Sequence, residues 1–248
     1  MRSLLVLLFL MLSTTPSNSQ PADSGQVVLL HGLARTSRSM ARLEKYLSVR
    51  GYRVVNIDYP SRKHRIDELA KMVRKEVVAK TRNGEKVHFI THSMGGIILC
   101  SIQQNDPLPN LGRVVMLSPP NQGSEVVDVL GNLSLFRFTN GPAGREIGTD
   151  EQSIPQQLGK IDFELGVITG DRSINWINSL LIPGKDDGKV SIESAKIEGM
   201  ADFRVVHVSH PFIMKDEKVM NECLHFLRNG FFSRETKPSG RPFSSLSI

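Results

Sequence analysis

Short β-branched, apolar runs alternate with amphipathic segments from Gln26 onward. The runs predicted as strands cover residues 27–31, 52–58, 86–91, 113–118, 163–169 and 203–209. Strands that are apolar throughout are typical of parallel sheets, because helices cover both of their faces. The pattern therefore predicts an α/β fold: a mostly parallel central sheet of about six strands with helices on both faces.

The segments between these runs repeat their apolar positions at the spacing of a helix. The recurring positions are Met40, Leu43 and Leu47; Ile66, Leu69, Ala70, Val73 and Val77; and Met220, Cys223, Leu224 and Leu227. Residues 94–104 are a further predicted helix. Gly51 and Gly230 follow the first and last of these helices, where glycine commonly ends a helix.

The alternation breaks between residues 121 and 160, which are rich in Gly, Pro, Asn and Gln. A long excursion of this kind is usually functional, so one interpretation is a lid or cap over a binding site. The other is a helix packed on the sheet. A cluster of apolar residues lies within this segment and fits either interpretation: Leu133, Leu135, Phe136 and Phe138.

The two ends of the chain differ from the middle. Residues 1–20 begin with Arg2, continue with an uncharged apolar run over 4–12 and become polar, which is typical of a secretory signal peptide. The run is too short to span a bilayer. Residues 233–248 are polar and are expected to form a loose tail. We expect an exported protein, periplasmic or secreted, with one domain over residues 21–232.

Composition excludes several classes of protein. The 248 residues are 40% hydrophobic and 23% charged, which excludes wholesale disorder and a polytopic membrane protein. The net charge of +6 is not clustered, so no nucleic-acid partner is expected. Neither of the two cysteines lies in a CxxC motif, and the sequence has no H-E-x-x-H motif or P-loop. We therefore expect no cofactor and no metal.

The strongest chemical signal lies where the third predicted strand meets the following helix. The sequence there is Thr91-His-Ser-Met-Gly-Gly96. A nucleophilic serine needs a sharp strand-to-helix turn that exposes its hydroxyl group, and small residues that relieve the crowding. Gly95 and Gly96 meet the second need. Thr91 replaces the first glycine of G-x-S-x-G and requires space beside the helix. Ser93 is the predicted nucleophile.

Three segments resemble those of the α/β-hydrolase fold, especially small bacterial lipases and esterases. They are LLHGL at 29–33, Asp58 to Pro60, and HSMGG at 92–96. The resemblance extends over roughly residues 26 to 230 and is weakest over 121–160. It implies an oxyanion hole formed by the backbone amides of Leu33 and Met94. Two such N–H donors stabilise a tetrahedral oxyanion.

A serine nucleophile needs a base, which follows an acid in the hydrolase order. His210, in the sequence VSHPF after the last predicted strand, resembles the histidine of the family. His31 and Gly32 are expected to shape the loop before Leu33, and the remaining histidines fit the role of base less well: His64, His88, His92, His207 and His225.

Three aspartates lie between the predicted nucleophile and base. Asp187 is favoured because its D-G-x-V sequence is similar to the one that carries the acid in many bacterial lipases. Asp171 follows a predicted strand and remains an alternative, as does Asp186. The acid must orient the imidazole, so it should be buried against the ring of His210.

These residues predict a serine hydrolase that cleaves carboxylic esters through a Ser-His-Asp triad and an acyl-enzyme. Amidases, peptidases and acyltransferases use the same fold and triad, and an inactive binding protein is a further alternative. The expected partner is a small-molecule or lipid acyl ester, with transient contact at a lipid interface, and the expected state is a monomer. The resemblance also implies that the helices carrying Cys100 and Cys223 lie on opposite faces of the sheet, too far apart for a disulfide.

Overall fold

The computed structural model describes residues 25–131, 133–174 and 176–234. The predicted signal peptide, residues 1–20, and most of the predicted tail, residues 235–248, lie outside this part. The strands are β1 (Gln26–Leu30), β2 (Arg53–Ile57), β3 (Val87–His92), β4 (Leu111–Leu117), β5 (Leu165–Gly170) and β6 (Asp202–Val206). The α-helices are α1 (Ala41–Ser48), α2 (Ile66–Lys80), α3 (Met94–Asn105), α4 (Glu125–Leu130), α5 (Ser134–Arg145), α6 (Ile154–Gln157), α7 (Trp176–Ser179) and α8 (Glu217–Asn229).

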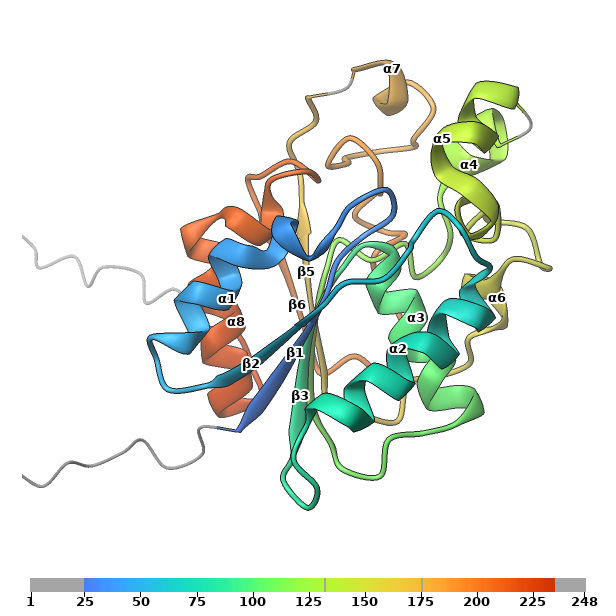
Figure 1. Cartoon of the computed structure of the whole chain (residues 1–248). Coiled ribbons are helices and arrows are strands. Elements are labelled where there is room, and N and C mark those ends of the chain that lie inside the picture. The colour runs from blue at the N-terminus through green and yellow to red at the C-terminus, as the bar shows by residue number, and fades with distance from the viewer. Residues whose placement is uncertain (1–24, 132, 175, 235–248) are drawn as a thin grey trace, which may run out of the picture.

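The six strands form one sheet in the order β2-β1-β3-β4-β5-β6, and every neighbouring pair is parallel. This confirms the prediction of a parallel sheet of six strands. Because all strands run the same way, their carboxyl ends lie at one edge. In open α/β sheets this edge is where ligands bind, and here it gathers the loops after β1, β3, β5 and β6 (Figure 1).

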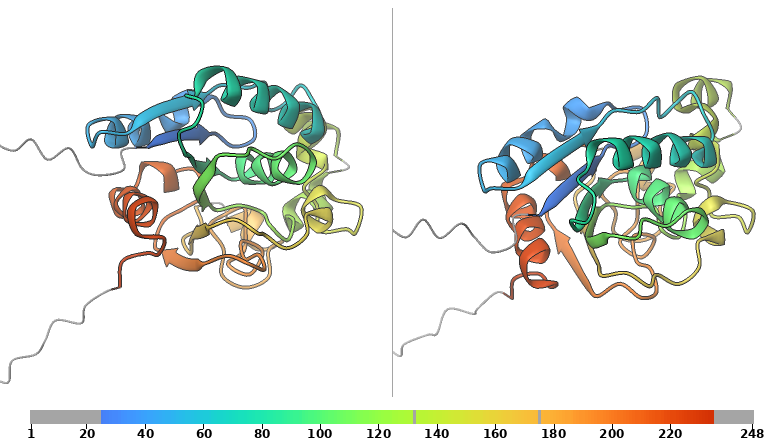
Figure 2. Two further views of the ribbon diagram at one scale, coloured as in Figure 1. Left: turned by 90° about the horizontal axis from the view of Figure 1, so that it is seen from below. Right: turned by 60° about the horizontal axis from the view of Figure 1, so that its bottom comes forward.

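Helices cover both faces of the sheet, as the apolar strand pattern predicts. Helices α1 and α8 lie on one face, and α2 and α3 lie on the other (Figures 1 and 2). Strand β1 shows how the pattern arises: Val28 and Leu30 join the core beneath α2 and α3, and Val27 and Leu29 join the core beneath α1 and α8. Alternate side chains thus serve opposite cores, so the strand is apolar from Val27 to Leu30.

The cysteines belong to these two separate cores. Cys100 lies on α3 and packs in one core, and Cys223 lies on α8 and packs in the other. Both are buried and free, as the resemblance implied.

The excursion at 121–160 contains α4, α5 and α6. It is helical, but α4 and α5 stand beyond the carboxyl ends of the strands and do not cover a face of the sheet (Figure 1). The residues of the apolar cluster differ in burial: Phe136 packs against the core, whereas Phe138 and Leu133 are 84% and 54% exposed. The side chain of Leu135 lies outside the described residues.

The last strand is shorter than predicted. The sequence predicted a strand to residue 209, but β6 ends at Val206. The N–H of Val208 donates to the carbonyl of Val206 at 2.8 Å, so the chain turns where a longer strand would have continued. His207 consequently lies beyond the strand and not within it. No helix of the described residues is long and apolar enough to cross a membrane.

Candidate active site

Ser93 occupies a strained turn between β3 and α3. Its φ of 53° lies in the left-handed region, which is uncommon for a residue with a side chain. The turn is possible because the residues at 95 and 96 are glycines. A Cβ atom on Gly95 would stand 2.9 Å from the carbonyl oxygens of both Leu30 and His31. Backbone strain of this kind concentrates at functional sites.

Thr91 fits because Gly96 leaves room for it. A Cβ atom on Gly96 would lie 3.3 Å from the Thr91 hydroxyl oxygen and 3.0 Å from the Met116 sulfur. Thr91 is fully buried in the space beside α3. The departure from the G-x-S-x-G pattern therefore leaves the turn intact.

The loop after β1 is packed directly against Ser93. A Cβ atom on Gly32 would meet Ser93 Cβ at 3.1 Å and His92 Nδ1 at 2.8 Å. His31 is fully buried and stacks on the ring of Tyr59 at 4.0 Å between centroids. Its Nε2 accepts from the Tyr59 N–H, so its Nδ1 carries the proton and donates to the Gly32 carbonyl. The Tyr59 hydroxyl donates to the His31 carbonyl. These contacts fix the loop that carries Leu33.

The two backbone amides predicted to form an oxyanion hole belong to the loop after β1 and to the start of α3. Leu33 follows Gly32 in this loop, and Met94 is the first residue of α3. Among the described residues, neither N–H donates to an acceptor within the protein. Met94 also stands at a helix N-terminus, where the dipole favours negative charge. Both amides are therefore available to an oxyanion beside Ser93.

His210 and Asp187 are held together by two hydrogen bonds. The ring Nδ1 of His210 lies 2.9 Å from Asp187 Oδ2, and the His210 N–H donates to the Asp187 carbonyl at 2.9 Å. The other carboxylate oxygen of Asp187 accepts from the N–H groups of Lys189 and Val190. Asp187 is fully buried and His210 is 3% exposed. The favoured aspartate thus meets the condition set for the acid.

The two alternative aspartates have other partners. Asp171 lies 2.8 Å from Nδ1 of His207, which is exposed and follows β6. Asp186 accepts from the Ser179 hydroxyl and from the Gly188 N–H. Of the three candidates in the described chain, Asp187 alone contacts the His210 ring.

The electrostatics of the site follow from burial and pairing. Burial by itself would raise the pKa of Asp187, but the charge and hydrogen bond of His210 and the backbone N–H of Val190 outweigh it and lower that pKa. Burial also lowers the pKa of His92 well below its usual range, helped by the charge of His210. His92 is therefore neutral, with Nε2 3.2 Å from the His210 carbonyl and its ring tilted against the His210 ring.

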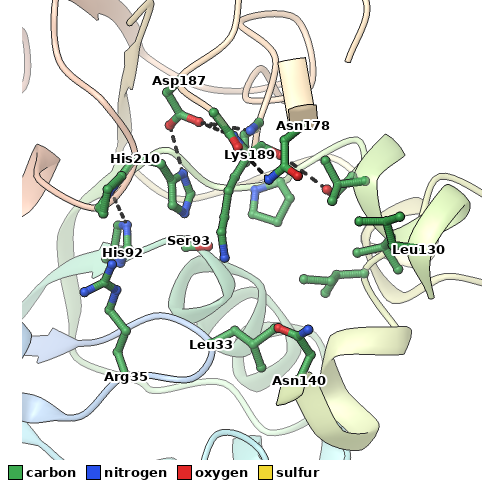
Figure 3. A pocket seen from close by; sticks show the side chains of 18 of the residues that line it. Leu33, Arg35, His92, Ser93, Leu130, Asn140, Asn178, Asp187, Lys189 and His210 are labelled. Carbon is green, nitrogen blue, oxygen red and sulfur yellow. Dashed lines mark hydrogen bonds and ion pairs between the residues drawn. The ribbon is translucent and has the colours of Figure 1, made fainter. Parts of the chain in front are cut away.

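Ser93, His210 and Asp187 line one cavity of about 400 Å³ at the carboxyl edge of the sheet (Figure 3). One wall is apolar and comes mainly from α4, α5 and the chain beside them, with Val126, Val127, Leu130, Phe136 and Ile147. Leu33 lies on the same side as Asn140 of α5 (Figure 3). The cavity therefore joins the polar site to an apolar surface.

Sequence reasoning missed two cationic residues of this cavity, Arg35 and Lys189. Both lie within two residues of positions that the motifs identify: Arg35 follows the HGL loop, and Lys189 follows Asp187 and Gly188. Their place in the motifs was the available signal. Within the described parts of the chain, no three His, Cys, Asp or Glu side chains gather so as to hold a metal ion.

Solved structures similar to this fold include three ester-cleaving proteins by name. A lipase from Bacillus licheniformis in its mature form superposes with a TM-score of 0.66 at 19% identity, covering 82% of this chain and 91% of that one. Phospholipase PlaB from Legionella pneumophila gives 0.64 at 19%, covering 82% of this chain and 57% of that one. A metagenomic carboxyl esterase gives 0.64 at 17%, covering 77% and 66%. Identities this low establish likeness of fold.

Curated protein sequences give no significant match to this chain. The model of the alpha/beta hydrolase family matches residues 27–176, which is more than half of the chain. The matched segment contains the loop after β1, the turn at Ser93 and the helices that form the apolar wall. On this match and on the topology of its sheet, the chain belongs to the α/β hydrolase family.

Proposed function

We propose that this protein is a serine hydrolase that cleaves carboxylic esters, with Ser93 as nucleophile, His210 as base and Asp187 as the acid that orients it. One observation carries the proposal. The strained turn at Ser93 and the hydrogen-bonded pair of His210 and Asp187 open into one cavity, although the three residues lie far apart in sequence. A strained serine beside a buried His–Asp pair is the arrangement that serine hydrolysis needs.

In the first step, Ser93 Oγ attacks the ester carbonyl and its proton passes to His210. The N–H groups of Leu33 and Met94 stabilise the oxyanion. The tetrahedral intermediate then collapses: the bond from the carbonyl carbon to the alcohol oxygen breaks, and His210 gives its proton to the departing alcohol. An acyl-enzyme on Ser93 remains.

In the second step, water attacks the acyl-enzyme as His210 takes its proton. Ser93 leaves with the proton returned by His210, and the carboxylic acid is released. Asp187 stays ionised throughout and stabilises the imidazolium that forms twice per turnover. Its lowered pKa supports that role.

The apolar wall supports an ester with a hydrophobic acyl chain. Phe136 and Leu130 stand beside the cavity on α5 and α4, so an acyl chain would bury apolar surface against them. The named activities of the similar structures are also on lipids and esters. Amide cleavage and acyl transfer would use the same groups, and no contact of the described residues favours either.

The test is hydrolysis of a p-nitrophenyl ester series from acetate to palmitate by the purified protein. We expect turnover by the wild type and loss of about 10³-fold or more in kcat for Ser93→Ala. Ser101→Ala is a matched control, because Ser101 lies on the same helix outside the cavity. We expect it to retain activity.

A fluorophosphonate probe provides a second readout that does not depend on the substrate chosen. We expect one phosphonyl adduct, mapped to the peptide that contains Ser93. Absence of both turnover and labelling in a folded protein would contradict the proposal and favour a hydrolase-like binding protein. Labelling without ester turnover would favour an amidase or an acyltransferase.

We further propose export, because residues 1–20 have the pattern of a signal peptide. Expression of the full chain in a bacterial host should give a mature protein outside the cytoplasm, beginning near Pro21 by intact mass. An unprocessed cytoplasmic chain would contradict this. A monomer and transient contact with a lipid interface are also proposals, tested by sedimentation and by vesicle flotation. Exposed Phe138 and Leu133 beside the cavity wall support the lipid contact.

A further inference from the structure

Two cations face the cavity that holds Ser93. Arg35 and Lys189 both line it, and within the described residues neither side chain makes an ion pair. The carboxylate among the lining residues is that of Asp187, and both of its oxygens are already hydrogen-bonded, one to the His210 ring and the other to two backbone N–H groups. The cavity therefore has an excess of positive charge beside the candidate nucleophile.

The main chain holds both residues firmly. Arg35 follows Ala34, whose φ of 55° lies in the left-handed region, directly after the loop that packs on Ser93. The N–H of Lys189 donates to Asp187 Oδ1 at 3.1 Å, which ties its backbone to the acid. In Figure 3 the Lys189 side chain extends from Asp187 into the cavity toward Ser93, and Arg35 lies beside His92.

This arrangement is electrostatically unfavourable without a partner. Part of the Lys189 side chain is open to solvent, but the side chain extends into the cavity, where surrounding protein displaces part of the water that would solvate its charge. That desolvation lowers the pKa of Lys189 and the charge of Arg35 lowers it further, and together they outweigh the charge of Asp187, which raises it. Desolvated like charges destabilise a site unless something of opposite charge binds there. An anionic ligand would remove the cost.

We propose that Arg35 and Lys189 bind an anionic group on the alcohol portion of the ester, which makes the substrate an acyl ester of an anionic alcohol. This inference rests on the proposed function. The side of the substrate follows from the chemistry, because His210 must protonate the departing alcohol. Arg35 lies on the same side of Ser93 as His92 and His210, whereas Leu130 of the apolar wall lies on the other side (Figure 3).

The anion is a carboxylate or a phosphate. The guanidinium of Arg35 presents a planar set of donors that suits either group, and Lys189 adds a compact charge with three donors. An acyl chain on the apolar wall and an anion on the two cations would lie on opposite sides of the scissile bond. Such a substrate is amphiphilic.

The test compares butyrate esters of four phenols that differ in one substituent at the 3-position. The substituents are carboxylate, phosphate, neutral carbamoyl and cationic trimethylammonio groups. Each value of kcat/KM is divided by the rate of hydroxide hydrolysis of the same ester, which removes differences in leaving-group reactivity. We expect the wild type to prefer the better anionic ester over the carbamoyl ester by about ten-fold or more, and the cationic ester to be the poorest.

Variants that remove one charge test whether Arg35 and Lys189 cause the preference for anionic esters. Lys189→Met and Arg35→Gln should each reduce the ratio of anionic to carbamoyl kcat/KM by several-fold, and the double variant should bring it close to one. Lys185→Met and Arg38→Gln are matched controls, because these residues are exposed and lie outside the cavity. They should keep the wild-type ratio.

The outcomes separate this inference from the proposed function. No turnover of any ester would defeat the proposed function and this inference with it. Turnover of all four esters at equal normalised rates would overturn the inference alone. A preference for anions that survives in the double variant would also overturn it. The faster of the two anionic esters identifies carboxylate or phosphate as the group bound.

Discussion

The two sides of the cavity are built by different means. Around Ser93 the main chain is confined by backbone contacts: Gly95 has no space for a Cβ atom, and Gly32 has none against Ser93 and His92. On the other side, α4 and α5 are short helices, and α5 contains a kink at Gly141 and Pro142. Buried apolar side chains such as Val127 and Ala143 anchor them to the core, while Phe138 faces solvent.

This difference in construction matches two different requirements, that of the proposed reaction and that of substrate binding. The proposed attack by Ser93 requires atoms held in fixed positions, and close backbone packing provides that. An acyl chain requires apolar area of adaptable shape, which side chains on short helices provide. We therefore expect changes on the Ser93 side to affect all substrates, and changes on the α5 side to depend on the acyl chain.

Among the variants that keep Ser93, Asp187→Asn should have the largest effect. The amide keeps the shape of the carboxylate but cannot stabilise an imidazolium, so kcat should fall by about 10⁴-fold for every ester. Steady-state kinetics across the p-nitrophenyl series checks this. Asp171→Asn is the matched control, because Asp171 pairs with the exposed His207. Equal losses in the two variants would contradict the assignment of the acid.

The next effect is on stability. Gly95→Ala would force a Cβ atom to within 2.9 Å of two carbonyl oxygens, so the free energy of unfolding should fall by about 2 kcal/mol or more. Gly159→Ala, where an added Cβ meets nothing within 4 Å, should change it by less than about 0.5 kcal/mol. Urea unfolding measures both. Similar values would show that the turn can relax.

Stability should also fall as the pH drops below about 6.5, the usual pKa of histidine. Burial lowers the pKa values of His31 and His92 in the folded protein. Below that pH the unfolded chain therefore binds more protons than the folded one does. The contribution of these two histidines to the free energy of unfolding is complete above about pH 6.5 and is lost on acidification. Thermal unfolding between about pH 7 and pH 5 measures it. His92→Gln should flatten the dependence.

The smallest effect concerns the α5 side. Phe136→Ala removes apolar surface from the cavity wall, so kcat/KM should fall by about ten-fold for long acyl chains and by much less for acetate. Phe138→Ala lies two residues away on the same helix and is 84% exposed. It should leave the profile on dissolved esters within about two-fold. A uniform loss in Phe136→Ala would contradict the division between the two sides.

The sequence by itself determined the parallel sheet, the covering helices and the turn at Ser93. These features depend on short-range rules: strands buried on both faces are apolar throughout, helices repeat every 3.6 residues, and a strained turn needs small neighbours. Gly95 and Gly96 lie two and three residues after Ser93, so their role is visible in the sequence. The prediction of the end of β6 was wrong because the N–H of Val208 bonds to the carbonyl of Val206 and turns the chain. The apolar residues of this segment give no sign of that turn.

Only the tertiary structure decided which groups meet at the carboxyl edge. Three aspartates were compatible with the order of the motifs, and the paths of the loops give His210 to Asp187 and His207 to Asp171. The same paths bring Arg35 and Lys189 to one cavity and stand α4 and α5 beyond the sheet. Motifs in the sequence favour Asp187 and lie close to Arg35 and Lys189, but they do not encode the contacts, which join segments far apart in the chain. They depend on how the whole chain packs.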